Sequence, residues 1–143
     1  MKLSGPGAEV LCLREGIRLV AYKDTKGIWT VGVGDIDMNN DGILDVKPDT
    51  HITREQALAN FAKDVTWAED AVNKYVTKPL TQNQFDALVS FVFNVGETQF
   101  KRSTLVKKLN VGDYEGAARE FDRWHVPIEI TSRRNSERDQ FKS

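Results

Sequence analysis

The chain has 143 residues, of which 40% are hydrophobic and 29% charged, and its formal net charge is −1. This composition is typical of one globular domain, and the near-zero net charge argues against nucleic acid as a partner. No run approaches the roughly 18 apolar residues of a membrane span, so no membrane anchor is expected. The single cysteine, Cys12, cannot form an intramolecular disulfide, and we expect it to be a small buried hydrophobic side chain.

The N-terminal part predicts one short helix followed by a small sheet. Apolar side chains recur at helical spacing near residues 8–15, and Gly16 stands where a glycine commonly ends a helix. From Leu19 to Val46 apolar residues alternate with others between frequent glycines. This pattern indicates short strands joined by turns.

From Thr53 onward the chain is predicted to be helical. A capping-box pattern begins at Thr53, and apolar residues then follow at 3.6-residue spacing, so one long helix is expected over 54–76. A second capping box begins at Thr81, before a segment over 85–95 that is apolar on nearly every side. Such a helix is normally the buried centre of a domain. Shorter helices are expected over 104–110 and 114–124 and from about 131.

These elements predict an α+β fold with a single domain over residues 1–143. A small sheet-bearing N-terminal lobe, about 16–52, would be joined by the long helix, about 54–76, to a helical C-terminal lobe, about 77–143. We expect the first helix to pack on the helical lobe.

Two carboxylates and a hydroxyl lie close together in the N-terminal part. Glu15 ends the first helix, Asp24 lies in a turn, and Thr30 begins the next strand. Glycosidic cleavage needs a protonated acid at the leaving oxygen and a second group that directs water or stabilises an oxocarbenium ion. Glu15, partly desolvated by apolar neighbours, is the candidate acid, although acidic residues near turns are more often solvated caps.

The segments around these residues resemble a known signature. Glu15-Gly-Ile-Arg-Leu-Val-Ala-Tyr-Lys-Asp24, followed by Gly27-Ile-Trp-Thr-Val-Gly-Val-Gly34, is similar to the signature of the phage lysozymes, glycoside hydrolase family twenty-four. The resemblance covers essentially the whole chain apart from an acidic insertion. The further matching segments are 80–88, 93–96, 103–105, 112–118, 121–124 and 133–137.

This resemblance implies a lysozyme-like fold and hydrolysis of the β-1,4 bond between N-acetylmuramic acid and N-acetylglucosamine in peptidoglycan glycan strands. It implies that Glu15 is the general acid. The reaction is expected to need no cofactor. Asp24 and Thr30 would hold the water, or Asp24 would attack or stabilise the anomeric carbon. Retention and inversion both remain open. The alternatives are a non-catalytic peptidoglycan-binding module and a lytic transglycosylase, and the intact set of three residues argues against both.

Substrate contacts are expected in the C-terminal half. The resemblance implies a catalytic cleft between the lobes, and Phe93 and Asn94 match a family stretch beside it. Asn94 would either hydrogen-bond an N-acetyl sugar or cap its own helix. Three arginines, Arg133, Arg134 and Arg138, could bind anionic groups of the cell wall. Structural pairing with Glu137 and neighbouring acidic residues is favoured instead.

The chain departs from the family at an acidic insertion. Asp35 stands where relatives usually carry a histidine, and it begins a stretch to Asp49 with five aspartates and one lysine. Part of this stretch matches the first nine positions of a calcium loop, although Pro48 replaces the usual glutamate at position twelve. The alternative is a polar hairpin with a tight turn. The ligands of a structural calcium ion would be Asp37, Asn39, Asp41, the carbonyl of Ile43, and Asp45.

The biological setting is inferred mainly from the resemblance. The N-terminus lacks the apolar core of a signal peptide, so synthesis in the host cytoplasm is expected. The protein would then reach the cell wall in the periplasm through membrane lesions made by a holin, and we expect a monomer.

Overall fold

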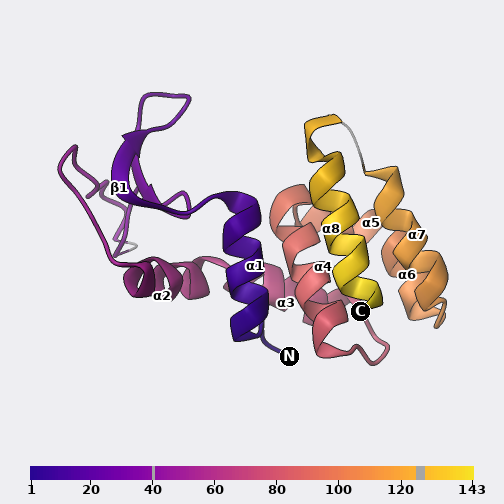
Figure 1. Cartoon of the computed structure of the whole chain (residues 1–143). Helices are drawn as coiled ribbons and strands as arrows, with labels where there is room; N and C mark the ends of the chain where they lie inside the picture. Colours follow the sequence, from indigo (N-terminus) through magenta and orange to yellow (C-terminus); the bar gives the residue numbers. More distant parts are fainter. Residues whose placement is uncertain (40, 125–127) are drawn as a thin grey trace. The chain divides into compact units, whose positions relative to one another are not determined.

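The computed structural model describes residues 1–39, 41–124 and 128–143 (Figure 1). Asn40, inside the predicted calcium loop, lies outside the described residues. The described residues form eight α-helices and a two-stranded antiparallel sheet, which confirms the α+β class. They group into two compact units, Ala8–Asp64 and Met1–Gly7 with Val65–Ser143, so α1 from Ala8 onward belongs with the sheet.

The helices and strands have the following bounds. The N-terminal elements are α1 (Gly5–Glu15), β1 (Arg18–Lys23), β2 (Trp29–Gly32) and α2 (Arg54–Asp64). The remaining α-helices are α3 (Thr66–Tyr75), α4 (Gln82–Val95), α5 (Glu97–Arg102), α6 (Thr104–Asn110), α7 (Tyr114–Glu120) and α8 (Thr131–Lys142). Two short 3-10 helices are η1 (Phe121–Arg123) and η2 (Ile128–Ile130).

The sheet unit is smaller and less regular than the sequence predicts. β1 and β2 pair antiparallel, with Tyr22 opposite Thr30, and isolated bridges replace further strands. Its core is formed by side chains of α1, β2 and α2, including Leu11, Val31 and Phe61. The prediction for Cys12 is confirmed, since it is buried there, and burial raises the pKa of its thiol to about 11.

The single long helix expected over 54–76 is divided at Val65. The Val65 carbonyl accepts hydrogen bonds from the backbone N–H groups of both Ala68 and Glu69, at 2.9 and 3.1 Å, where α3 begins. Val65 and Thr66 are both β-branched, which weakens helix propensity at this point. Periodicity alone therefore overstated the length of this element.

The helical unit is organised around α4. Its predicted capping box at Thr81 is confirmed, and its residues from Phe85 to Val92 are buried, as expected for a central helix. α4 packs against α3 and α8, and α8 runs beside it in Figure 1. The Phe91 ring meets Phe100 and Phe121 edge-on at centroid distances of 6.2 and 5.4 Å.

Two features of this unit differ from the expected helices. The helix expected over 114–124 ends earlier, at Glu120, and continues as the single 3-10 turn η1. α5 has no counterpart among the predicted elements, because α4 and α5 are separated only by Gly96, whose φ of 93° ends one helix and admits the next.

Candidate active site

Glu15 is the last residue of α1, and the chain turns sharply after it. Gly16 has a φ of 84°, a conformation that glycine adopts without steric cost, and its N–H donates to the Cys12 carbonyl at 2.9 Å. The Glu15 side chain is half-buried, and its Oε1 is shielded from solvent. The structure thus holds this carboxyl at a helix end in a partly desolvated position.

Asp24 shapes the turn between β1 and β2. Its Oδ1 accepts hydrogen bonds from the backbone N–H groups of Lys26 and Ile28, at 2.8 and 2.9 Å. The Asp24 N–H in turn donates to the Ile28 carbonyl at 2.9 Å. These bonds fix the carboxylate and occupy Oδ1, so Oδ2 is the oxygen left to meet a substrate or water.

Thr30 lies on β2 and is only 3% exposed. Its Oγ1 donates a hydrogen bond to the Ile28 carbonyl at 2.9 Å. The peptide groups of Ile28 therefore connect both side chains, because its N–H holds Asp24 and its carbonyl holds Thr30. With its own proton engaged, the Thr30 oxygen can act towards other groups only as an acceptor.

Asp35 is held beside a second carboxyl that sequence reasoning missed. Its backbone exchanges two 2.9 Å hydrogen bonds with Val31, and the residue is 7% exposed. Burial, a hydrogen bond with Asp64 and the charges of Asp64 and Asp45 raise the pKa of Asp35 to about 8. Asp64 ends α2, and nothing in its local sequence marks it as the partner of Asp35.

The predicted calcium loop holds its own backbone. Asp37 Oδ2 accepts from the Gly42 N–H, and Asp41 Oδ1 from the Ile43 N–H, both at 2.8 Å. Asp45 Oδ1 accepts from Met38 N–H at 2.8 Å, and Asn39 Oδ1 from Asp41 N–H at 3.3 Å. Within residues 1–39, 41–124 and 128–143, no three His, Cys, Asp or Glu side chains gather in a way that could hold a metal ion.

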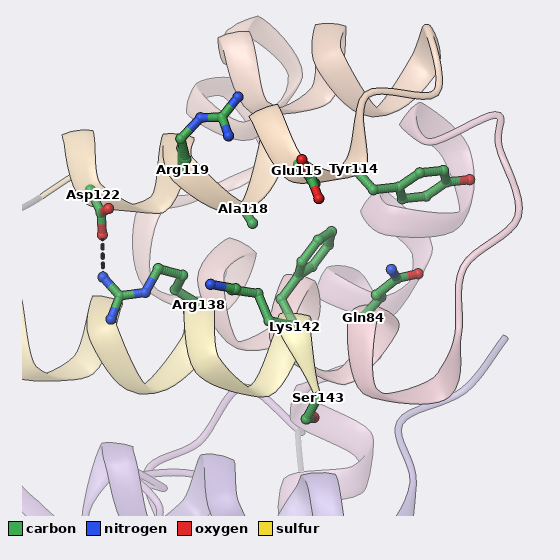
Figure 2. A pocket seen from close by; sticks show the side chains of 10 residues that line it. Gln84, Tyr114, Glu115, Ala118, Arg119, Asp122, Arg138, Lys142 and Ser143 are labelled. Atoms are coloured by element: carbon green, nitrogen blue, oxygen red, sulfur yellow. Dashed lines mark hydrogen bonds and ion pairs between the residues drawn. The ribbon is translucent and has the colours of Figure 1, made fainter.

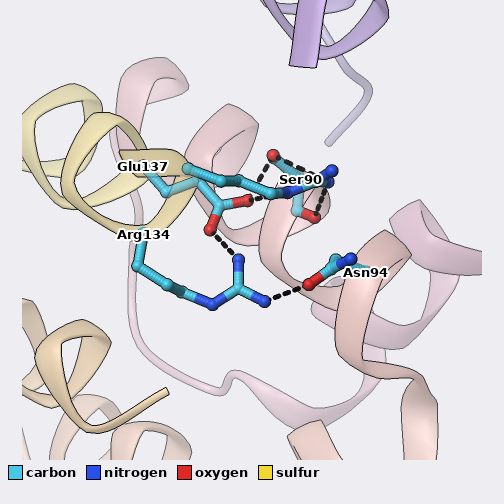
Figure 3. A network of polar contacts seen from close by, with 5 residues as sticks. Ser90, Asn94, Arg134 and Glu137 are labelled. Carbon is cyan, nitrogen blue, oxygen red and sulfur yellow. Dashed lines mark hydrogen bonds and ion pairs between the residues drawn. The ribbon is translucent and has the colours of Figure 1, made fainter. Parts of the chain in front are cut away.

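Asn94 belongs to a polar network in the helical unit (Figure 3). Its Oδ1 accepts a hydrogen bond from the Arg134 guanidinium, which also pairs with Glu137, and both of these charged side chains are buried. The Ser90 hydroxyl donates a hydrogen bond to Glu137, and Arg133 Nε lies 3.2 Å from Glu137 Oε2. The alternative role of Asn94 as a helix cap is wrong, because α4 is capped at Gly96.

The arginines have structural partners, as the favoured interpretation predicts. Arg133 and Arg134 pair with Glu137, whereas Arg138 pairs with Asp122 at 2.7 Å and Asp139 at 3.1 Å. The pair of Arg138 and Asp122 lies at a pocket of about 610 Å³ in the helical unit (Figure 2). Side chains of both charge signs line this pocket, and it contains none of the predicted catalytic residues.

Phe93 precedes Asn94 on α4 and meets an aromatic residue of α3. The rings of Phe93 and Trp67 are stacked, with centroids 5.8 Å apart and planes inclined by 26°. Sequence reasoning named Phe93 but not Trp67. The spacing of apolar residues on α3 could have indicated that this tryptophan lies off the buried face.

The chain is similar to phage lysozymes over almost its whole length. The model of the phage lysozyme family matches residues 13–137. An endolysin of Acyrthosiphon pisum secondary endosymbiont phage 1 is 41% identical, and one of Salmonella phage P22 is 39% identical, each over 100% of this chain and 99% of the relative. A crystal structure of a P22 lysozyme mutant superimposes with a TM-score of 0.91, at 39% identity, and covers 100% of this chain and 99% of that one.

Proposed function

The chain belongs to the phage lysozyme family, and we propose that Glu15, Asp24 and Thr30 carry out its reaction. Its activity is that of a muramidase, an enzyme that hydrolyses the β-1,4 bond between N-acetylmuramic acid and N-acetylglucosamine in peptidoglycan. The observation that carries the assignment of roles is the turn in which Ile28 holds both Asp24 and Thr30.

Glu15 supplies the proton to the glycosidic oxygen. A leaving sugar needs this proton as the bond to the anomeric carbon breaks. The Glu15 carboxyl is half-buried at the end of α1. Glu15→Gln keeps the shape of the side chain but cannot supply the proton, so it removes this step alone.

Asp24 and Thr30 hold the attacking water. Both present acceptor oxygens, because Asp24 Oδ1 is engaged by backbone N–H groups and the Thr30 proton by the Ile28 carbonyl. A water that donates its two protons to Asp24 Oδ2 and Thr30 Oγ1 turns a lone pair towards the anomeric carbon. Direct attack by such water inverts the anomeric configuration, whereas attack by Asp24 itself retains it.

The decisive assay is clearing of outer-membrane-permeabilised Gram-negative cells. Wild type is expected to lower the turbidity, and Glu15→Gln is expected to be inactive while giving the same circular dichroism spectrum. If wild type clears the cells no faster than Glu15→Gln, the assignment of Glu15 fails. Mass spectrometry of the digest should show reducing ends, since anhydromuramic ends would mean transglycosylation. Proton NMR of the first product reports the anomer.

The proposed reaction needs no cofactor, and a calcium ion at the acidic loop would be purely structural. The hydrogen bonds of the loop support this proposal. Its side-chain oxygens accept from backbone N–H groups of the same loop and hold it compact; they belong to Asp37, Asn39, Asp41 and Asp45. Pro48 at the twelfth position weakens it. Calorimetric titration should detect calcium binding that Asp41→Ala abolishes. No heat at millimolar calcium would reject the proposal.

The proposed function also includes how the protein reaches the cell wall and its oligomeric state. None of the helices in the described part of the chain is long and apolar enough to cross a membrane. The relatives named endolysins support action at the cell wall. We propose that the enzyme is a monomer and reaches the wall through lesions made by a holin-type partner. Co-expression with and without a holin, followed by periplasmic fractionation, tests the release. Light scattering tests the monomer.

A further inference from the structure

The pocket of about 610 Å³ lies between α7 and α8, and all of its lining belongs to the helical unit (Figure 2). Its apolar lining residues, Ala118 and Phe141, are buried, with 5% and 3% of their surface exposed. The other lining residues are polar or charged. Apolar contact surface combined with a few polar groups is the usual composition of a site for a small ligand.

Hydrogen bonds and an ion pair fix the walls of this pocket at its two ends. At one end Arg138 Nη1 of α8 pairs with Asp122 Oδ1 of η1 at 2.7 Å (Figure 2). At the other end the Tyr114 hydroxyl donates to the Pro79 carbonyl at 2.7 Å, and the capping box of α4 holds the side chain of Gln84. A ligand would therefore meet walls that are already in place, which lowers the entropic cost of binding.

The charged side chains of the pocket stand one helical turn apart on each wall. Glu115 and Arg119 lie on α7, whereas Arg138 and Lys142 lie on α8. Asp122 neutralises Arg138. The other three, Glu115, Arg119 and Lys142, are exposed, and none of them forms an ion pair with another residue that the structure describes. The pocket thus keeps two positive charges and one negative charge that protein groups leave available.

These three charges determine which class of ligand fits. Carboxylates pair well with the guanidinium of Arg119 and the ammonium of Lys142, and an ammonium group pairs with the carboxylate of Glu115. A ligand with negative charges alone, such as phosphate, would be repelled by Glu115. Two carboxylates and one ammonium group are the charged groups of a short acidic peptide with a free amino end.

We propose that the pocket between α7 and α8 binds a short acidic peptide, whose carboxylates pair with Arg119 and Lys142 and whose ammonium group pairs with Glu115. The aliphatic part of the peptide contacts Ala118 and Phe141. This binding function goes beyond the muramidase reaction, because none of the residues proposed for catalysis lines the pocket.

A titration followed by amide chemical shifts tests the two positive charges. The dipeptide alanyl-glutamate should shift the amide signals of α7 and α8 in a saturable way, with a Kd of about 1 mM. Arg119→Gln and Lys142→Gln should each weaken binding about twofold to fivefold, the usual size of one exposed ion pair. The matched control is Lys107→Gln, which removes the same charge from an exposed position on α6 outside the pocket and should leave the Kd unchanged.

Two further probes test the negative charge. N-acetyl-alanyl-glutamate lacks the ammonium group, so wild type should bind it about twofold to fivefold more weakly than alanyl-glutamate, and Glu115→Gln should lose this preference. Inorganic phosphate should bind more weakly than the dipeptide. All three replaced side chains are exposed, so the variants should keep the wild-type circular dichroism spectrum.

Three results would overturn the proposal. The first is the absence of saturable shifts with alanyl-glutamate in wild type. The second is dipeptide binding that Arg119→Gln and Lys142→Gln leave unchanged. The third is phosphate or the acetylated dipeptide binding to wild type as tightly as alanyl-glutamate, which would make the pocket a simple anion site.

Discussion

Replacing Asp35 by asparagine should change how the stability of this protein depends on pH. Asp35 is 7% exposed and faces Asp64 from α2 and Asp45 from the acidic loop. Burial and these two carboxyls raise its pKa to about 8 in the folded protein, compared with about 3.9 in an unfolded chain. Between these values the folded state keeps a proton that the unfolded state has lost.

The sign and size of the effect follow from proton linkage. The stabilisation is fully present below pH about 4 and is lost as the pH rises towards 8, because the unfolded state binds fewer protons. One proton changes the free energy of unfolding by about 1.4 kcal/mol per pH unit, so Asp35 removes roughly 3 kcal/mol between pH 5 and 7. At 2–4 °C per kcal/mol, this lowers the Tm by about 6–12 °C.

Thermal unfolding followed by circular dichroism from pH 5 to 8 measures this slope. Asp35→Asn keeps the shape and neutrality of the protonated side chain, so its Tm should exceed that of wild type by a margin that grows from pH 5 to pH 8. Groups that do not contact Asp35 contribute equally to both proteins, so the difference between the two curves reports Asp35 and its interaction with Asp64. Asp49→Asn, an exposed position, is the matched control. Parallel curves for wild type and Asp35→Asn would refute the reasoning.

Three further predictions concern other parts of the chain. Thr30→Val should lower kcat about 100-fold while KM stays near the wild-type value, as expected for loss of a group that orients water; rates on soluble fragments check this. Gly7→Ala should destabilise the fold by about 1–3 kcal/mol in urea unfolding, because an added Cβ would clash with the Asp86 side chain. Arg134→Met should cost about 3–5 kcal/mol in the same assay, since it leaves buried Glu137 without this partner, and an effect below 1 kcal/mol would contradict the network.

Local patterns in the sequence predicted much of the fold, and the family resemblance supplied the proposed catalytic residues. The capping boxes at Thr53 and Thr81 depend on side chains three residues apart, and both are present. The turn that holds Asp24 and Thr30 likewise spans only a few residues. Because these features depend on near neighbours, residue type and spacing were sufficient to predict them.

Only the tertiary structure decided which distant groups meet. The break at Val65 lies within a continuous apolar pattern, so periodicity could not indicate it. The partner of Asp35, the stack of Trp67 on Phe93 and the bond from Arg134 to Asn94, 40 residues away, have no local signature. Packing brings such groups together after the helices and strands have formed, and it therefore determined the surroundings of the proposed catalytic residues.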